Sequence, residues 1–177
     1  MKKIPALSRL LSRMVLAGAL LQSVSTVYAE DLRALLNDRG YVAVELTENR
    51  FGHFIAHGEL NNTPVDILVD SGATTTVVDQ SFVSRINATT RESSIRAVGL
   101  GGSQGYLEIA DFSDFSLGEQ ALEASEMKVM NLEHINRVYR SNDVRTLSAI
   151  IGSDYLKAHN AIIDYENNLL WLQPATI

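Results

Sequence analysis

The sequence contains no cysteine, and this absence removes several kinds of chemistry at once. The chain can form no disulfide bond, offers no thiolate to a metal ion and has no cysteine nucleophile. Basic residues are in the minority, with 15 Lys and Arg against 21 Asp and Glu and a net charge of −6. Because nucleic-acid binders carry a basic face, this balance argues against a general nucleic-acid binder.

Proline is scarce, at 3 of 177 residues, and neither a Gly/Ser-rich or Pro-rich linker nor an internal repeat divides the chain. Since a domain takes roughly 100–200 residues, the length favours one domain over two. It is too short for an enzyme that needs two complete β-barrel lobes in one chain. The composition, 46% hydrophobic and 20% charged, is that of an ordinary globular protein.

Long hydrophobic runs are also missing, and the apolar run at residues 14–21 is well short of the roughly 20 residues that span a bilayer. Residues 1–29 carry four basic residues and no acidic one, and they end at the small Ala29. A basic start, a short apolar middle and a small residue at the end form the layout of a secretory signal peptide. We therefore predict cleavage after Ala29, export to a bacterial periplasm and no membrane span in the mature chain.

Short apolar runs separated by turn signals make up most of the remaining chain, a pattern typical of an all-β barrel or sandwich. The strands expected from these runs are residues 41–46, 51–60, 65–69, 94–100, 106–112, 124–130, 147–151, 161–165 and 169–172. Short helices are expected at 32–36, 79–86 and 153–159, with Asp79 and Ser153 as N-caps of the last two. We interpret the irregular residues 131–145 as a surface loop with a helical turn, and the sequence does not decide whether they border a substrate cleft.

The mature chain is interpreted as one domain, residues 51–177, preceded by an N-terminal arm, residues 30–50. The arm's sequence leaves open whether it is a pro-segment that is removed or an outer strand of the domain.

The most informative stretch is residues 67–78, Ile-Leu-Val-Asp-Ser-Gly-Ala-Thr-Thr-Thr-Val-Val. A fully apolar strand here ends in Asp70, Gly72 permits a tight turn, and β-branched residues then return the chain to β structure. A carboxylate at the end of a buried strand is costly unless it is hydrogen-bonded or used. Asp, Ser and Gly alone are ordinary turn residues, so the flanking strands are what make Asp70 a candidate catalytic residue.

A second stretch, residues 149–156, has an apolar strand, a glycine and a short helix. Together the two stretches resemble the retropepsin-like aspartic proteases, and Gly52-His53-Phe54 is similar to the hairpin start of an exported bacterial branch. The resemblance covers about residues 51–173. It implies an all-β, retropepsin-like closed β-barrel with short helices and one lobe per chain.

The resemblance also assigns roles to individual residues. It makes Asp70 the catalytic aspartate and implies an aspartic-type endopeptidase that uses no cofactor and no metal ion. Its supporting residues would be Ser71, Gly72 and Ala73, and its crossing strand Ile150, Ile151 and Gly152. A flap that covers an extended peptide substrate would contain Gly99, Leu100, Gly101, Gly102 and Ser103. Ser71 stands where many relatives carry threonine.

Aspartic proteolysis uses two carboxylates that share one proton and activate one water molecule. The chain contains one Asp-Ser-Gly, while Asp154 is interpreted as a helix N-terminal acid and Asp164 as a strand-end acid. The second carboxylate must therefore come from Asp70 of another subunit, which a twofold homodimer supplies. The alternative from another functional class is a catalytically silent dimer of the same fold that binds a peptide or protein.

Two further patterns have weaker support. Gly101-Gly102-Ser103-Gln104-Gly105 matches the nucleophile elbow of serine hydrolases, but the following residues alternate like a strand where that motif requires a helix. His53 and His57 lie on one side of an expected strand, yet a zinc site would need further ligands. We expect His53 to pack at the strand start.

Overall fold

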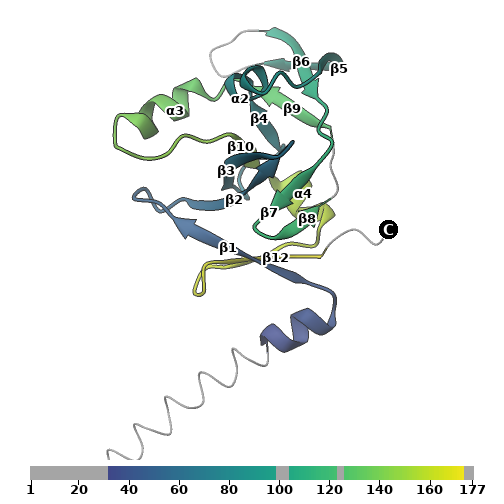
Figure 1. Ribbon diagram of the computed structural model, residues 1–177, viewed down its shortest axis with the longest axis vertical. Helices are drawn as coiled ribbons and strands as arrows, with labels where there is room; N and C mark the ends of the chain where they lie inside the picture. Colours follow the sequence, from purple (N-terminus) through teal and green to yellow (C-terminus); the bar gives the residue numbers. More distant parts are fainter. Residues whose placement is uncertain (1–31, 99–103, 123–125, 174–177) are drawn as a thin grey trace, which may run out of the picture. The chain divides into compact units, whose positions relative to one another are not determined.

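The computed structural model describes residues 32–98, 104–122 and 126–173 (Figure 1). The chain separates into two units, residues 1–41 and residues 42–177. In the first unit residues 32–38 are helical, where a helix is expected at 32–36, and Gly40 follows with a φ of 79° that favours glycine. The predicted signal peptide lies outside the described residues. No helix in the described part of the chain is long and apolar enough to cross a membrane.

The second unit consists mostly of strands, so the all-β prediction is confirmed. The strands are β1 (Val42–Glu48), β2 (Phe54–Leu60), β3 (Thr63–Val69), β4 (Val77–Asp79), β5 (Thr90–Val98), β6 (Gln104–Ala110), β7 (Phe115–Leu117), β8 (Gln120–Leu122), β9 (Met127–Met130), β10 (Ala149–Ile151), β11 (Ile162–Asp164) and β12 (Leu169–Leu172). Three short helices, α2 (Gln80–Arg85), α3 (Glu133–Arg140) and α4 (Ser153–Ala158), interrupt them.

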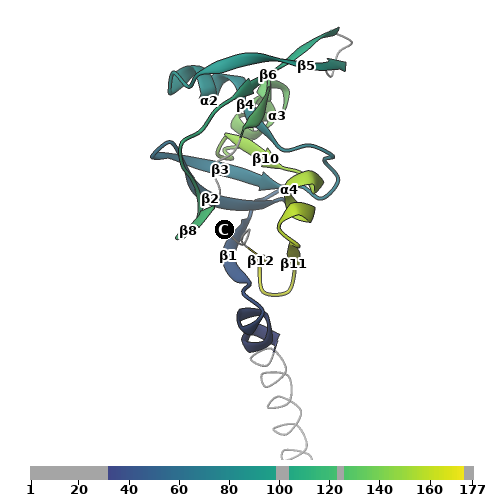
Figure 2. The same cartoon turned by 90° about the vertical axis from the view of Figure 1, so that its right-hand side faces the viewer.

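The strands pair in the order β11-β12-β1-β2-β3-β10-β4-β9-β6-β5, and β7 pairs with β2 and β8. Figure 2 shows β5 and β6 at the end of this unit opposite β11 and β12. The β2–β3 hairpin expected from the sequence is present, and its turn residues Asn61 and Asn62 adopt φ values of 48° and 56°. Asparagine tolerates this left-handed conformation better than most residues, which explains its place in the turn.

β10 lies between β3 and β4, parallel to β3 and antiparallel to β4. A strand that is covered on both faces reads as a continuous apolar run. Ala149, Ile150 and Ile151 are all buried, as are residues 65–69 of β3. The expected crossing strand is thus a central strand of the sheet.

Three sequence expectations are corrected by the structure. Residues 131–145 are not a loop with a helical turn, because α3 covers eight of them. The N-cap of α4 is Gly152 and not Ser153, while Asp79 is the N-cap of α2 without a capping side-chain bond. β7 and β8 were not expected, since three-residue strands are too short to show an alternating pattern.

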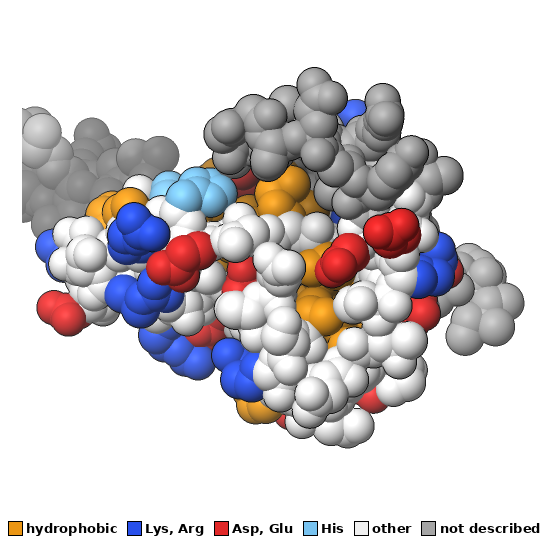
Figure 3. Space-filling view, turned by 90° about the horizontal axis from the view of Figure 1, so that it is seen from above, with side chains coloured by type: hydrophobic (Ala, Val, Ile, Leu, Met, Phe, Trp, Pro, Cys, Tyr) orange, Lys and Arg blue, Asp and Glu red, His pale blue; other side chains and the backbone are white. Residues whose placement is uncertain are grey.

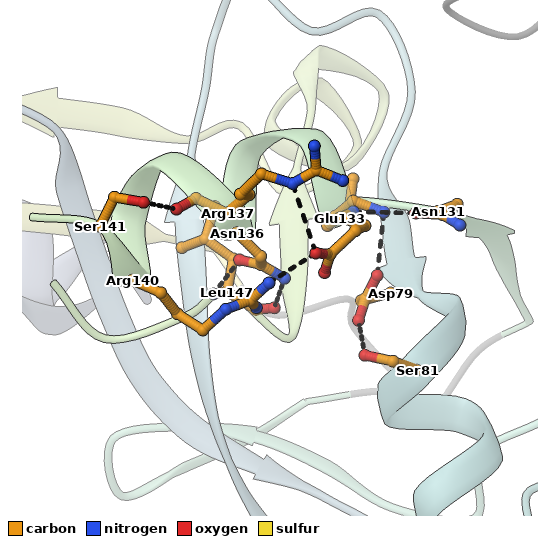
Figure 4. Close-up of polar contacts among 10 residues, drawn as sticks. Asp79, Ser81, Asn131, Glu133, Asn136, Arg137, Arg140, Ser141 and Leu147 are labelled. Carbon is orange, nitrogen blue, oxygen red and sulfur yellow. Dashed lines mark hydrogen bonds and ion pairs between the residues drawn. The ribbon is translucent and has the colours of Figure 1, made fainter.

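Buried polar side chains hold α3 against the sheet (Figure 4). Asp79 at the end of β4 accepts a hydrogen bond from the backbone N–H of Leu132 at 2.9 Å and another from the hydroxyl of Ser81. Asn136 bonds both backbone groups of Leu147, donating from Nδ2 at 3.0 Å and accepting at Oδ1 at 2.8 Å. These bonds satisfy backbone groups that would otherwise be buried without partners.

Charged side chains of both signs lie interspersed on the face shown in Figure 3. Exposed ion pairs join Glu133 to Arg140 along α3, and Arg91 of β5 to Glu126. Exposed pairs of this kind contribute little to stability, so the fold depends chiefly on its apolar core and buried polar bonds.

We expect Asn136→Ala to lower the free energy of unfolding by about 2–4 kcal/mol, because it leaves two buried backbone groups of Leu147 unpaired. Urea denaturation measures the change. Ser141→Ala removes an exposed side-chain bond to Arg137 from the same helix and should cost much less. Equal losses in the two variants would contradict the role of Asn136.

Candidate functional site

The tight turn after β3 fixes the position of Asp70. The backbone N–H of Asp70 donates to the carbonyl oxygen of Ile151 at 3.0 Å. The carbonyl oxygen of Asp70 accepts a hydrogen bond from the N–H of Ala73 at 3.2 Å. The N–H of Gly72 donates to Asp70 Oδ1 at 2.8 Å, which orients the carboxylate. Asp70 is half-buried.

The segment that follows the Asp70 turn lies in close contact with the segment that joins β10 to α4. The N–H of Ser153 donates to the carbonyl oxygen of Ala73 at 2.7 Å, and the N–H of Gly152 donates to Thr76 Oγ1 at 3.0 Å. A Cβ atom on Gly152 would lie 2.7–2.9 Å from the backbone of Thr75, closer than real Cβ contacts. Glycine is required at this position because the two backbones approach one another so closely.

Asp154 in the first turn of α4 also holds the Asp70 turn. Its carboxylate accepts hydrogen bonds from the backbone N–H of Thr76 at 2.8 Å and from Thr76 Oγ1 at 2.7 Å. Partial burial would raise the pKa of Asp154, but the hydrogen bonds from Thr76 and Tyr155 and the charge of Lys128 together lower it. The acid expected at a helix N-terminus is therefore also a clamp between α4 and the segment after Asp70.

A cavity of about 420 Å³ opens beside Asp70 and Ser71. Apolar side chains from several elements form most of its wall: Phe54, Leu68, Val69, Ile135, Ile163 and Tyr165. Gly52, His53 and Tyr139 complete it. Among the described residues that line the cavity, Asp70 is the one carboxylate. A cavity of this size accommodates a side chain of a bound ligand next to a group that can take or give a proton.

The structure brings together most residues that the sequence singles out. Asp70, Ser71, Gly72 and Ala73 form the turn, and Ile150, Ile151 and Gly152 run beside it. The hydroxyl of Ser71 is exposed and has no hydrogen-bond partner among the residues described. Its supporting role stays a prediction, as do the catalytic roles of the turn.

The predicted flap residues Gly99, Leu100, Gly101, Gly102 and Ser103 lie outside the described residues. β5 and β6 are described on either side of them and pair as far as Val98 and Gln104.

Sequence reasoning missed the contribution of α3 to the cavity. Ile135 and Tyr139 line it from a segment whose relation to a cleft the sequence left open. Their spacing of four residues places both on one helix face, and this was the available signal. His53 does pack at the strand start, since its ring stacks on Tyr139 with centroids 6.0 Å apart.

His53 and His57 have separate partners. His53 Nδ1 lies 2.6 Å from Tyr139 Oη, whereas His57 Nδ1 lies 2.7 Å from the buried carboxylate of Asp66. Arg145 Nε contacts the same carboxylate at 2.8 Å. Within the described ranges, no group of three His, Asp or Glu side chains is placed to hold a metal ion.

We expect Asp154→Asn to destabilise the protein in a pH-dependent way. A carboxylate whose pKa is lowered by folding adds stability above its unfolded pKa, ordinarily 3.8, and that stability is lost as the pH falls through the folded pKa. Because Asp154 is exposed, the loss at pH 7 should be about 1 kcal/mol or less.

Urea denaturation of wild type and Asp154→Asn between about pH 7 and 3 measures this difference, with the exposed Asp143→Asn as the control. The difference in free energy of unfolding between the two proteins should be largest at neutral pH and become small below about pH 4. A difference that grows on acidification would contradict the stabilising role of the Asp154 carboxylate.

Gly152→Ala should lower the free energy of unfolding by about 1–3 kcal/mol, because the added methyl group forces the Thr75 backbone away. Thermal unfolding measures it, and Ser153→Ala, one residue along, serves as the control. An unchanged melting temperature for Gly152→Ala would show that the two segments can separate freely.

Comparison with known proteins gives one family and several similar folds. A family model described as aspartyl protease matches residues 56–155. The curated proteins contain no match.

Three solved structures are similar to the chain. A retropepsin-like aspartic protease from Rickettsia conorii is 17% identical, with a TM-score of 0.46, over 75% of this chain and 89% of that one. The retroviral protease-like domain of Ddi1 from Leishmania major is 21% identical, with a TM-score of 0.44, over 70% and 88%. The EIAV protease in complex with the inhibitor HBY-793 is 19% identical, with a TM-score of 0.46, over 67% and 98%.

Proposed function

The chain belongs to the aspartyl protease family, and on that premise we propose that it is an exported aspartic endopeptidase whose catalytic pair is formed by Asp70 from two copies of the chain. The observation that carries the proposal is the place of Asp70. This carboxylate is oriented by its own turn, half-buried, and the one acid among the described residues of an apolar cavity. Such a site suits proton transfer to and from a peptide substrate.

Peptide hydrolysis by this site needs one ionised and one protonated carboxylate. The ionised Asp70 takes a proton from water as the water oxygen attacks the peptide carbonyl carbon. The protonated Asp70 of the other copy donates its proton to the carbonyl oxygen. When the tetrahedral diol collapses and the C–N bond breaks, the first Asp70 gives its proton to the leaving nitrogen and the second takes a proton from a hydroxyl of the diol. The dyad thus returns to its starting state without a covalent intermediate.

A second copy is required because one chain supplies one such carboxylate. Asp154 is held by Thr76, and Asp164 accepts bonds within its own turn from Glu166 and Asn167. Both acids are thus committed to local structure. A twofold axis near the Asp70 turn would bring each Asp70 opposite its copy, and two like carboxylates at close range share a proton.

The substrate in this proposal is a peptide in extended conformation, held by backbone hydrogen bonds and covered by residues 99–103. The predicted signal peptide, residues 1–29, supports export, and the proposed location is the bacterial periplasm. The proposed mechanism uses no cofactor, because the two carboxylates themselves activate the water.

Asp70→Asn should reduce cleavage of a mixed peptide library by about 10²–10⁴-fold, because an amide cannot act as a base. The measurement uses residues 30–177 between about pH 4 and 7, where a carboxylate pair that shares a proton operates. The exposed Asp143→Asn is the matched control and should retain wild-type activity.

Cleavage that survives in Asp70→Asn would refute the catalytic assignment. Peptide binding without cleavage by the wild-type dimer would instead favour a silent binding domain of the same fold.

A further inference from the structure

A histidine and a buried tyrosine form a polar edge to the apolar cavity beside Asp70. His53 Nδ1 lies 2.6 Å from Tyr139 Oη, and Tyr139 is only 2% exposed. The ring of Phe51 stacks on Tyr139 with centroids 5.6 Å apart and planes inclined by 30°. The imidazole of His53 contacts the rings of both Phe51 and Tyr139, each with centroids 6.0 Å away, and the Tyr139 hydroxyl, while it stays exposed at the cavity.

The tyrosine fixes which nitrogen of His53 is available to a ligand. Burial raises the pKa of Tyr139, so its phenol stays protonated. A neutral phenol can donate to Nδ1 of the neutral imidazole, which then carries its hydrogen on Nε2, and it accepts from Nδ1–H of the imidazolium. The imidazolium carries a hydrogen on Nε2 as well, and among the described residues Nε2 has no hydrogen-bond partner.

His53 is the one basic side chain among the described residues that line this cavity. Asp70 lies at the end of β3, Tyr139 on α3 and Tyr165 in the turn between β11 and β12. No Lys or Arg is among the described residues that line the cavity, and the neighbouring Arg50 donates to the carbonyl oxygen of Asn142 at 2.8 Å. Protonation of His53 thus introduces a cation into a cavity whose other ionised group is the catalytic carboxylate.

We propose that His53, positioned by Tyr139, is a specificity-determining residue that selects peptides with a glutamate or aspartate side chain next to the scissile bond under mildly acidic conditions. This inference rests on the proposed peptidase function and names its substrate class. An acidic side chain in an apolar cavity beside Asp70 is disfavoured by desolvation and repulsion. The His53 imidazolium offsets both through a charge-assisted hydrogen bond from Nε2.

The acidity window follows from ordinary histidine chemistry. Histidine is the side chain whose charge ordinarily changes between about pH 5 and 8, with the cation at the acidic end of that range. A neutral ring with its hydrogen on Nε2 can still donate a hydrogen bond to the side chain of either glutamine or glutamate. It has no preference for the charged one. Preference for the carboxylate should therefore fade as the pH rises, while recognition of the neutral amide persists.

The inference is tested with three peptides that are identical except for the residue next to the scissile bond, which is Glu, Gln or Leu. For the wild type, the ratio of kcat/KM for Glu over Gln should be about tenfold at pH 5 and close to one at pH 8. His53→Gln keeps a donor but not the charge, so its ratio should be close to one at both pH values. His134→Gln, on the exposed face of α3, is the matched control and should keep the wild-type ratio.

Tyr139→Phe separates positioning from charge. It keeps the packed ring but loses the hydroxyl that orients His53, and we expect it to lower the Glu over Gln ratio at pH 5 several-fold. A ratio that does not change with pH, or that persists in His53→Gln, would overturn the inference even if every peptide is cut.

Binding measurements keep the test independent of catalysis. In the Asp70→Asn background, fluorescence anisotropy at pH 5 should show tighter binding of the Glu than of the Gln peptide, and His53→Gln should remove the difference. Absence of cleavage by the wild type would refute the proposed peptidase function but not the specificity. Equal binding of the Glu and Gln peptides, in the protein that carries His53 as well as in His53→Gln, would refute the specificity.

Discussion

The passage of β10 beside β3 is the constraint on which the site depends. The bond from the Asp70 N–H to the carbonyl of Ile151 extends this pairing by one residue beyond the end of β3. The bond from Ser153 to Ala73 then holds the far side of the turn. Gly152 allows the two segments to approach, since any side chain there would meet the Thr75 backbone. The Asp70 turn is thus held by backbone hydrogen bonds to the segment from β10 into α4.

Much of this arrangement was predictable because it is local in the sequence. The run Ile67–Val69 indicates a buried strand, and the Asp-Ser-Gly that follows indicates a tight turn. The contribution of α3 was less predictable. Its segment carries buried Asn136 and Tyr139 among charged residues, and a polar residue that is buried to bond a distant backbone group leaves no periodic apolar signal. The clamp between Asp154 and Thr76 joins residues far apart in sequence, which a motif cannot show.

The polar and apolar parts of the cavity have different tasks. Apolar side chains form most of its wall, while Asp70 and His53 are the acidic and the basic side chain among its described lining residues. In a medium of low polarity each charge acts more strongly than at the surface. Asp154 and Asp164 accept hydrogen bonds from backbone groups, so in the proposed mechanism a single chain supplies only one catalytic carboxylate. The proposed catalytic unit is therefore an assembly of two chains.

Mixing wild-type protein with the Asp70→Asn variant at constant total concentration tests that claim most directly. If chains exchange freely and each active site needs Asp70 from both, activity at an equal mixture should fall to about a quarter, because only wild-type pairs are active. The same mixture would retain about half of the activity if each chain worked alone, and that result would contradict the account.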